Sequence, residues 1–67
     1  MIYSLHKMLS NTALKYHELG EVQGETIVLI AKSLDAEGVF EVMHIKEMAD
    51  MFNLTTKWDG QNIQIVK

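Results

Sequence analysis

The chain has 67 residues, enough for one small domain, and its hydrophobic content of 48% is ample for a globular core. It has no cysteine, so disulfide bonds, thiolate metal sites and cysteine nucleophiles are excluded. Its 6 basic residues are all lysine, against 9 acidic residues, and the net charge is -3. Because phosphate and guanine contacts rely on lysine and arginine, this composition argues against conventional nucleic-acid binding.

The N-terminal segment, MIYSLHKMLSNTALKYHELG, is interrupted by polar residues throughout. It lacks the apolar core of a signal peptide, and no run in the chain approaches the length of a membrane span. We therefore expect a cytoplasmic protein with no membrane partner.

Apolar residues of this segment recur at steps of three and four, which predicts an amphipathic helix over residues 3–19 that stops at Gly20. His6 and His17 are expected on its polar side. The apolar stripe consists of Ile2, Leu5, Met8, Leu9, Ala13, Tyr16 and Leu19.

The next segment, residues 20–25, carries two glycines and is predicted to be a linker. Residues 26–34 follow with a continuous apolar run rich in β-branched side chains, which favours a strand. The spacing of Ile27, Ile30 and Leu34 is helical, so a buried helix is the alternative.

Residues 35–38 (DAEG) are typical of a turn, and residues 39–42 (VFEV) of a short strand. A short helix is then predicted over residues 44–53, with Asn53 as a left-handed cap. Its apolar positions, at steps of three and four, are Ile45, Met48, Ala49 and Phe52.

The C-terminal segment, LTTKWDGQNIQIVK, predicts two strands joined by a two-residue turn at Asp59-Gly60, a favoured hairpin signal. Thr56 and Trp58 would share one face of the first strand, and Ile63 and Ile65 one face of the second.

No serine or threonine stands in a glycine-flanked nucleophile elbow, and the glycines of residues 20–24 are not followed by the lysine and hydroxyl of a phosphate loop. The acidic cluster Asp35, Glu37 and Glu41 has too few ligands for a calcium loop and is expected to be a solvated turn. No two histidines have the i, i+4 spacing of a helical metal site. We expect no enzyme activity, no cofactor and no metal.

Three residues are the candidates for an interaction site: Trp58, Lys57 and His44. Tryptophan is enriched in interface hot spots, so Trp58 at a hairpin could anchor a partner. The favoured role for the single tryptophan is nevertheless core packing. His44 is expected at the start of the second helix, as a partly exposed residue near its cap.

Residues 43–66 resemble the C-terminal half of the copper amine oxidase-like N-terminal domain, also called the stalk domain. The resemblance implies a structural or binding α+β module without catalysis and without copper. His44 and Lys46 stand where that family has proline and arginine. Asn53 falls where the family has glycine. The other residues at corresponding helix and hairpin positions are Ile45, Met48, Ala49, Phe52, Trp58, Asp59, Gly60 and Ile65.

A second resemblance, over residues 27–56, is to a winged helix, with Ala49 at the helix crossing and Asn53-Leu54 as the turn. A DNA-reading helix should follow the turn, but only Thr55 to Trp58 precede the Asp-Gly break. Whether residues 26–34 form a strand or a helix decides between the two resemblances.

Together these patterns predict a single α+β domain spanning residues 1–67, with an N-terminal helix, a strand pair, a short helix and a C-terminal β-hairpin. We expect a non-catalytic protein-interaction or accessory module that binds a protein partner or itself as a homodimer. Its size and acidity suit a phage or mobile-element product. The alternative is a winged-helix-like DNA-binding regulator.

Overall fold

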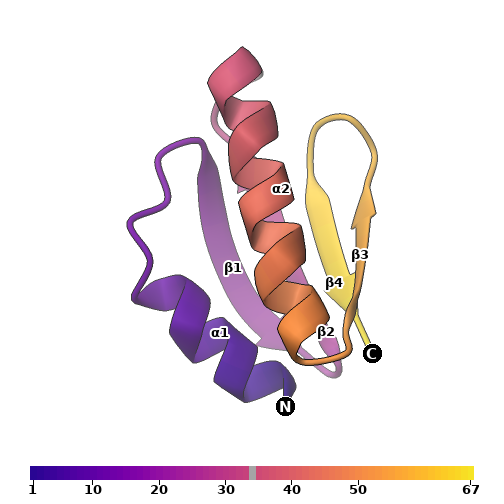
Figure 1. The fold of residues 1–67 in the computed structure, drawn as a ribbon. Helices are drawn as coiled ribbons and strands as arrows, with labels where there is room; N and C mark the ends of the chain where they lie inside the picture. Colours follow the sequence, from indigo (N-terminus) through magenta and orange to yellow (C-terminus); the bar gives the residue numbers. More distant parts are fainter. Residues whose placement is uncertain (34) are drawn as a thin grey trace.

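The computed structural model describes residues 1–33 and 35–67, and it places two helices against one face of a four-stranded sheet (Figure 1). This arrangement confirms the predicted α+β class. The elements in chain order are α1 (Ile2–Ser10), β1 (His17–Gln23), β2 (Thr26–Ala31), α2 (Ala36–Met51), β3 (Thr55–Trp58) and β4 (Ile63–Val66).

The strands lie in the order β1-β2-β4-β3, and each adjacent pair is antiparallel. Because β2 and β3 are both antiparallel to β4, they run parallel to each other with β4 between them. Two parallel strands need a long crossover connection, and α2 provides it. The sheet therefore has β1 and β3 as its two edges.

The core lies between the sheet and the helices. Ile27 pairs with Ile65 and Leu29 with Ile63, so four fully buried aliphatic side chains project from the two central strands toward the helices. Full burial of such a side chain stabilises the fold by about 1.5–3 kcal/mol. The helices contribute Ile2, Leu5, Leu9, Val42, Ile45, Met48 and Ala49 to the core, and the segment between α2 and β3 contributes Leu54.

The first helix is shorter than the periodicity predicts: it ends at Ser10, and the prediction of helix to residue 19 is wrong. Leu19 instead lies in β1, paired with Leu29. Gly20 is no helix stop. A Cβ at Gly20 would lie 2.7 Å from the Val28 carbonyl oxygen, so only glycine allows the strands to approach this closely. Pairing with β2 has overridden the local helical pattern.

The predicted linker over residues 20–25 is also mostly strand, and only Gly24 and Glu25 connect β1 to β2. Gly24 has a φ of 64° while Glu25 has a negative φ, the pattern of a type II′ hairpin turn. The strand predicted from residue 26 is confirmed as Thr26–Ala31, and the helical alternative is wrong there. Its last predicted residue, Leu34, lies outside the described residues.

The second helix is longer than predicted, because residues 36–43 belong to it. The turn predicted at 35–38 and the strand predicted at 39–42 are both wrong. Asp35 is the N-cap, and its carboxylate accepts a hydrogen bond of 3.0 Å from the Gly38 N–H. Val42 then lies on the same helix face as the buried Ile45 and Ala49, so burial of this stripe outweighs the β-propensity of the segment.

The predicted left-handed cap at Asn53 is confirmed by its φ of 58°. The Leu54 N–H donates to the Ala49 carbonyl at 3.0 Å, and the Asn53 N–H donates to the Asp50 carbonyl at 3.1 Å. These two bonds form a Schellman motif, and both Leu54 and Ala49 are buried in the core. The motif turns the chain from α2 into β3.

The C-terminal hairpin is confirmed, but its loop is longer than predicted. Trp58 pairs with Ile63, so the loop is residues 59–62 and not Asp59-Gly60 alone. The Asp59 carboxylate accepts hydrogen bonds from the N–H groups of Gln61 and Asn62 at 2.8 and 2.7 Å. These bonds close the loop from inside, as in an Asx turn.

The left-handed backbone of Asn53 generates a stability prediction. Replacing Asn53 with alanine puts an ordinary side chain at positive φ, and we expect the free energy of unfolding to fall by about 1 kcal/mol. Asn53→Gly is the matched control and should equal or exceed the wild type, because glycine adopts this conformation freely. Urea denaturation followed by Trp58 fluorescence measures both. Equal destabilisation by the two changes would contradict the role of the cap.

A buried hydroxyl generates a second prediction. Among the described residues, the Thr56 Oγ1 atom is buried and has no hydrogen-bond partner. Thr56→Val replaces this hydroxyl with a methyl group of similar size and should raise the free energy of unfolding by about 1 kcal/mol. The same urea titration tests it. A loss of stability would show that the hydroxyl has a partner, such as a bound water molecule.

Candidate interaction surface

Three exposed apolar side chains, Val39 (41% exposed), Phe40 (69%) and Met43 (56%), lie on the N-terminal half of α2, and a fourth, Trp58 (44%), lies at the end of β3. On α2, Met43 is adjacent to both other residues at helical spacings of three and four. Trp58 and Val39 line the same small hollow, of about 100 Å³. We call these four residues the helix–hairpin patch.

The exposure of Trp58 shows that the favoured core role is wrong. Its pairing with Ile63 directs the indole toward the helix layer. However, Trp58 is the last residue of an edge strand, and the residues of α2 that adjoin it in the hollow are Gly38, Val39 and Val42. The indole is therefore covered on one side only.

The structure brings Lys57 and Trp58 together but places His44 apart from them. Lys57 is adjacent to Trp58 in β3 and lies on the opposite face of the sheet, and both line a shallow hollow of about 280 Å³. His44 is exposed in the middle of α2, one turn after Phe40, so its predicted place near a helix cap is wrong.

The residue pattern did not identify Val39, Phe40 and Met43 as surface residues of a helix. They were assigned to a strand or left unassigned, and only a helical register puts them on the side of α2 away from Ile45. The signal that could have found them is the N-cap Asp35, which starts the helix early enough to include them.

Glu41 points to the other side of α2 and binds three consecutive residues at the start of β1. Its Oε2 atom accepts a hydrogen bond from the Lys15 N–H at 2.8 Å. Its Oε1 atom accepts one from the Tyr16 N–H at 3.0 Å and one from the His17 imidazole Nδ1 at 2.9 Å. We call this arrangement the Glu41 clamp. It attaches the edge strand β1 to the helix.

The clamp corrects two predictions. His17 does not lie on the polar side of a helix; it lies in β1 and is only 3% exposed. The acidic cluster is not a solvated turn, because Asp35 caps α2, Glu37 accepts a hydrogen bond from the Tyr16 hydroxyl, and Glu41 forms the clamp. His6, on α1, is half-buried, and its Nε2 donates to the Gly20 carbonyl at 2.8 Å.

These contacts perturb two ionisable groups. Burial alone raises the pKa of the Glu41 carboxyl, but the hydrogen bonds from Lys15, His17 and Tyr16 outweigh burial and hold the pKa below its ordinary value of 4.5. The hydrogen bond to the Glu37 carboxylate, with smaller contributions from burial and nearby negative charge, raises the pKa of Tyr16 to about 12.

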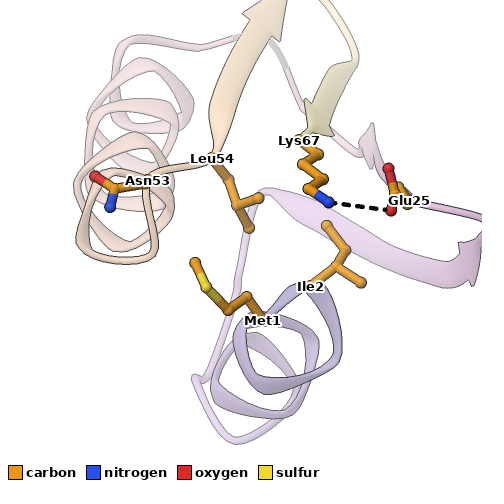
Figure 2. A pocket seen from close by; sticks show the side chains of 6 residues that line it. All are labelled: Met1, Ile2, Glu25, Asn53, Leu54 and Lys67. Carbon is orange, nitrogen blue, oxygen red and sulfur yellow. Dashed lines mark ion pairs between the residues drawn. The ribbon is translucent and has the colours of Figure 1, made fainter.

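A larger pocket, of about 370 Å³, lies at the opposite end of the molecule, between α1, the β1–β2 turn and the chain after α2. Figure 2 shows Ile2 and Leu54 projecting into it, with Lys67 directed toward Glu25 at its rim. The distance from the Lys67 Nζ to the Glu25 Oε1 is 3.5 Å, and such an exposed ion pair contributes little stability. The other lining residues are Met1 and Asn53.

Within residues 1–33 and 35–67, no three histidine, aspartate or glutamate side chains converge as a metal site would require. No helix in the same ranges is long and apolar enough to cross a membrane. Comparison of the chain with protein-family models, curated proteins and solved structures gave no match. The resemblances to a stalk domain and to a winged helix stay predictions from residue patterns.

The Glu41 clamp generates a pH prediction. A carboxylate with a lowered pKa stabilises the fold above pH 4.5, and this contribution is lost as the pH falls through its folded-state pKa. In Glu41→Gln the side chain has only one acceptor oxygen in place of two. We therefore expect the free energy of unfolding to fall by about 1–3 kcal/mol at pH 7. Thermal unfolding from pH 7 to pH 3 should therefore show the wild type and the variant converging in acid.

Glu47→Gln is the matched control, because Glu47 is exposed on the same helix. Its midpoint temperature should stay close to that of the wild type at pH 7. A difference between Glu41→Gln and the wild type that stays constant to pH 3 would contradict the charged clamp.

Proposed function

We propose that this domain is a non-catalytic protein-interaction module that binds a partner protein through the helix–hairpin patch. The observation that carries the proposal is the exposure of four large apolar side chains on a small domain: Met43 follows Val39 and Phe40 by one helical turn, and Val39 lines one hollow with Trp58. Contiguous apolar surface of this kind marks protein contact sites, and tryptophan is among the residues that dominate binding energy in such sites.

The chemistry of the patch supports binding without catalysis. Its four side chains are apolar or aromatic and offer no nucleophile, acid or base. The patch side chains are carried by α2 and β3, so they are held by regular secondary structure and not by a flexible loop. Because the backbone is already ordered, no loop has to be ordered when the partner binds.

The charges near the patch favour a different protein over a second copy. Asp35 is exposed and lines the same hollow as Val39 and Trp58, and Asp59 is exposed directly after Trp58. Lys46, on the same helix, is already paired with Asp50 at 2.9 Å. Two copies meeting through this surface would bring acidic residues together, which opposes association.

Site-specific photo-cross-linking tests the proposal. A photoreactive phenylalanine analogue at position 40, in cells of the source organism, should give a discrete cross-linked protein. The same analogue at position 3 is the matched control, because Tyr3 is also 69% exposed but lies on α1. The position-40 product should disappear in Met43→Ser, a surface change expected to alter stability by less than about 0.5 kcal/mol.

Identical products from both positions, or none from position 40, would contradict the proposal. A duplex DNA titration separates it from the DNA-binding alternative. We expect no salt-dependent binding of duplex DNA at low ionic strength. DNA binding that weakens steeply with salt would favour the alternative of a DNA-binding regulator.

A further inference from the structure

We propose that β3 binds an extended segment of the partner as an additional strand, so that the segment lies beside the helix–hairpin patch and carries an acidic residue opposite Lys57. This inference rests on the proposed function and specifies the conformation and charge of the partner. Figure 1 shows β3 at the outer margin of the sheet, with no other element beside it among the described residues.

The hydrogen-bond pattern of the hairpin determines which backbone groups of β3 are free. The Asp59 N–H donates to the Asn62 carbonyl at 3.3 Å, so the backbone polar groups of this pair face inward, toward each other across the hairpin. In an antiparallel ladder inward and outward residues alternate, so Lys57 and Thr55 also bond to β4. Thr56 and Trp58 therefore direct their N–H and C=O groups away from the sheet, ready to pair with an added strand.

The two sheet edges differ in how well they are protected. The register of β1 shifts between Leu19 and Val22, and such an irregularity disrupts edge pairing. The Gly20 carbonyl of β1 already accepts a hydrogen bond from His6, and the Glu41 clamp occupies the N–H groups just before the strand. On β3 the register is regular over all four residues, so β3 is the accessible edge.

Side chains on both faces of β3 specify the added strand. On the helix-facing side, Trp58 and Val39 offer apolar surface to alternate residues of the partner. On the other side, Lys57 is exposed and makes no ion pair within the described part of the chain. Asp59 does not compete for the partner, because its carboxylate is bound within its own loop. An acidic residue opposite Lys57 is the complementary choice.

Lys57 also argues against a second copy as the added strand. The antiparallel arrangement that pairs Thr56 with Trp58 of the other copy, and Trp58 with its Thr56, sets the two Lys57 side chains directly opposite each other. Like charges in this position destabilise a strand pair. Lysine on an edge strand is a common means of preventing self-association.

Amide hydrogen exchange measured by NMR tests the inference first in the free protein. The amides of Thr56 and Trp58 should exchange fast, and those of Thr55 and Lys57 slowly. The probe is then the peptide acetyl-Val-Thr-Val-Glu-Val-Thr-Val-amide. At ten times its dissociation constant, it should slow exchange at Thr56 and Trp58 by about tenfold. Protected Thr56 and Trp58 amides in the free protein, or no response to millimolar peptide, would overturn the inference.

Two variants make the test specific. Thr56→Pro removes an outward N–H without removing a bond to β4, so it should abolish peptide binding, whereas Thr56→Val should retain it. Lys57→Glu should shift the preference to the peptide with lysine in place of glutamate. If Thr56→Pro does not fold, N-methylation of alternate peptide residues blocks the same bonds. Full binding by the N-methylated peptides, or an unchanged charge preference in Lys57→Glu, would overturn the inference.

The two proposals fail in distinguishable ways. Loss of the position-40 cross-link in Met43→Ser tests the helix–hairpin patch. Slower amide hydrogen exchange at Thr56 and Trp58 on adding the peptide tests the β3 edge. A cross-link that survives in a chain carrying Thr56→Pro would keep the patch as an interaction site and overturn strand addition. Peptide binding on β3 without any position-40 cross-link would keep strand addition and overturn the patch as the interaction site.

Discussion

The structure depends on the attachment of α2 to β1 by the carboxylate of Glu41. This group accepts hydrogen bonds from Lys15, Tyr16 and His17, residues that lie more than 20 positions away in the chain. A lost hydrogen bond to a half-buried N–H leaves that group without a partner, at a cost of about 1–3 kcal/mol. In a domain of this size such a cost is a large share of the total stability.

The same attachment determines which surfaces are exposed. With Glu41 facing β1, the core stripe of α2 covers the central strands, and Val39, Phe40 and Met43 face solvent or β3. The crossover by α2 also makes β3 an outer strand, because β4 returns between β2 and β3. The helix–hairpin patch and the free strand edge thus arise from one topology, which is why both lie on the same side of the molecule.

Local signals predicted several elements well. The β-branched run at Thr26–Ala31, the C-terminal hairpin and the left-handed Asn53 are all as expected, because each depends on neighbours in sequence or on turn chemistry. The failures occurred where a local preference met a distant partner. Leu19 fits a helical stripe but pairs with Leu29, and the β-prone residues at 39–42 form a helix capped by Asp35.

The sequence by itself determined the strand from residue 26, the C-terminal hairpin, the left-handed cap at Asn53 and the exclusion of cysteine chemistry, because these follow from residue type and short-range patterns. Only the tertiary structure decided that residues 17–23 form a strand, that Trp58 is exposed and that Glu41 is a structural group. Each of these depends on the order of the strands, which is set by contacts between β2 and β4 across more than 30 residues. No window of local sequence contains both partners of such a contact.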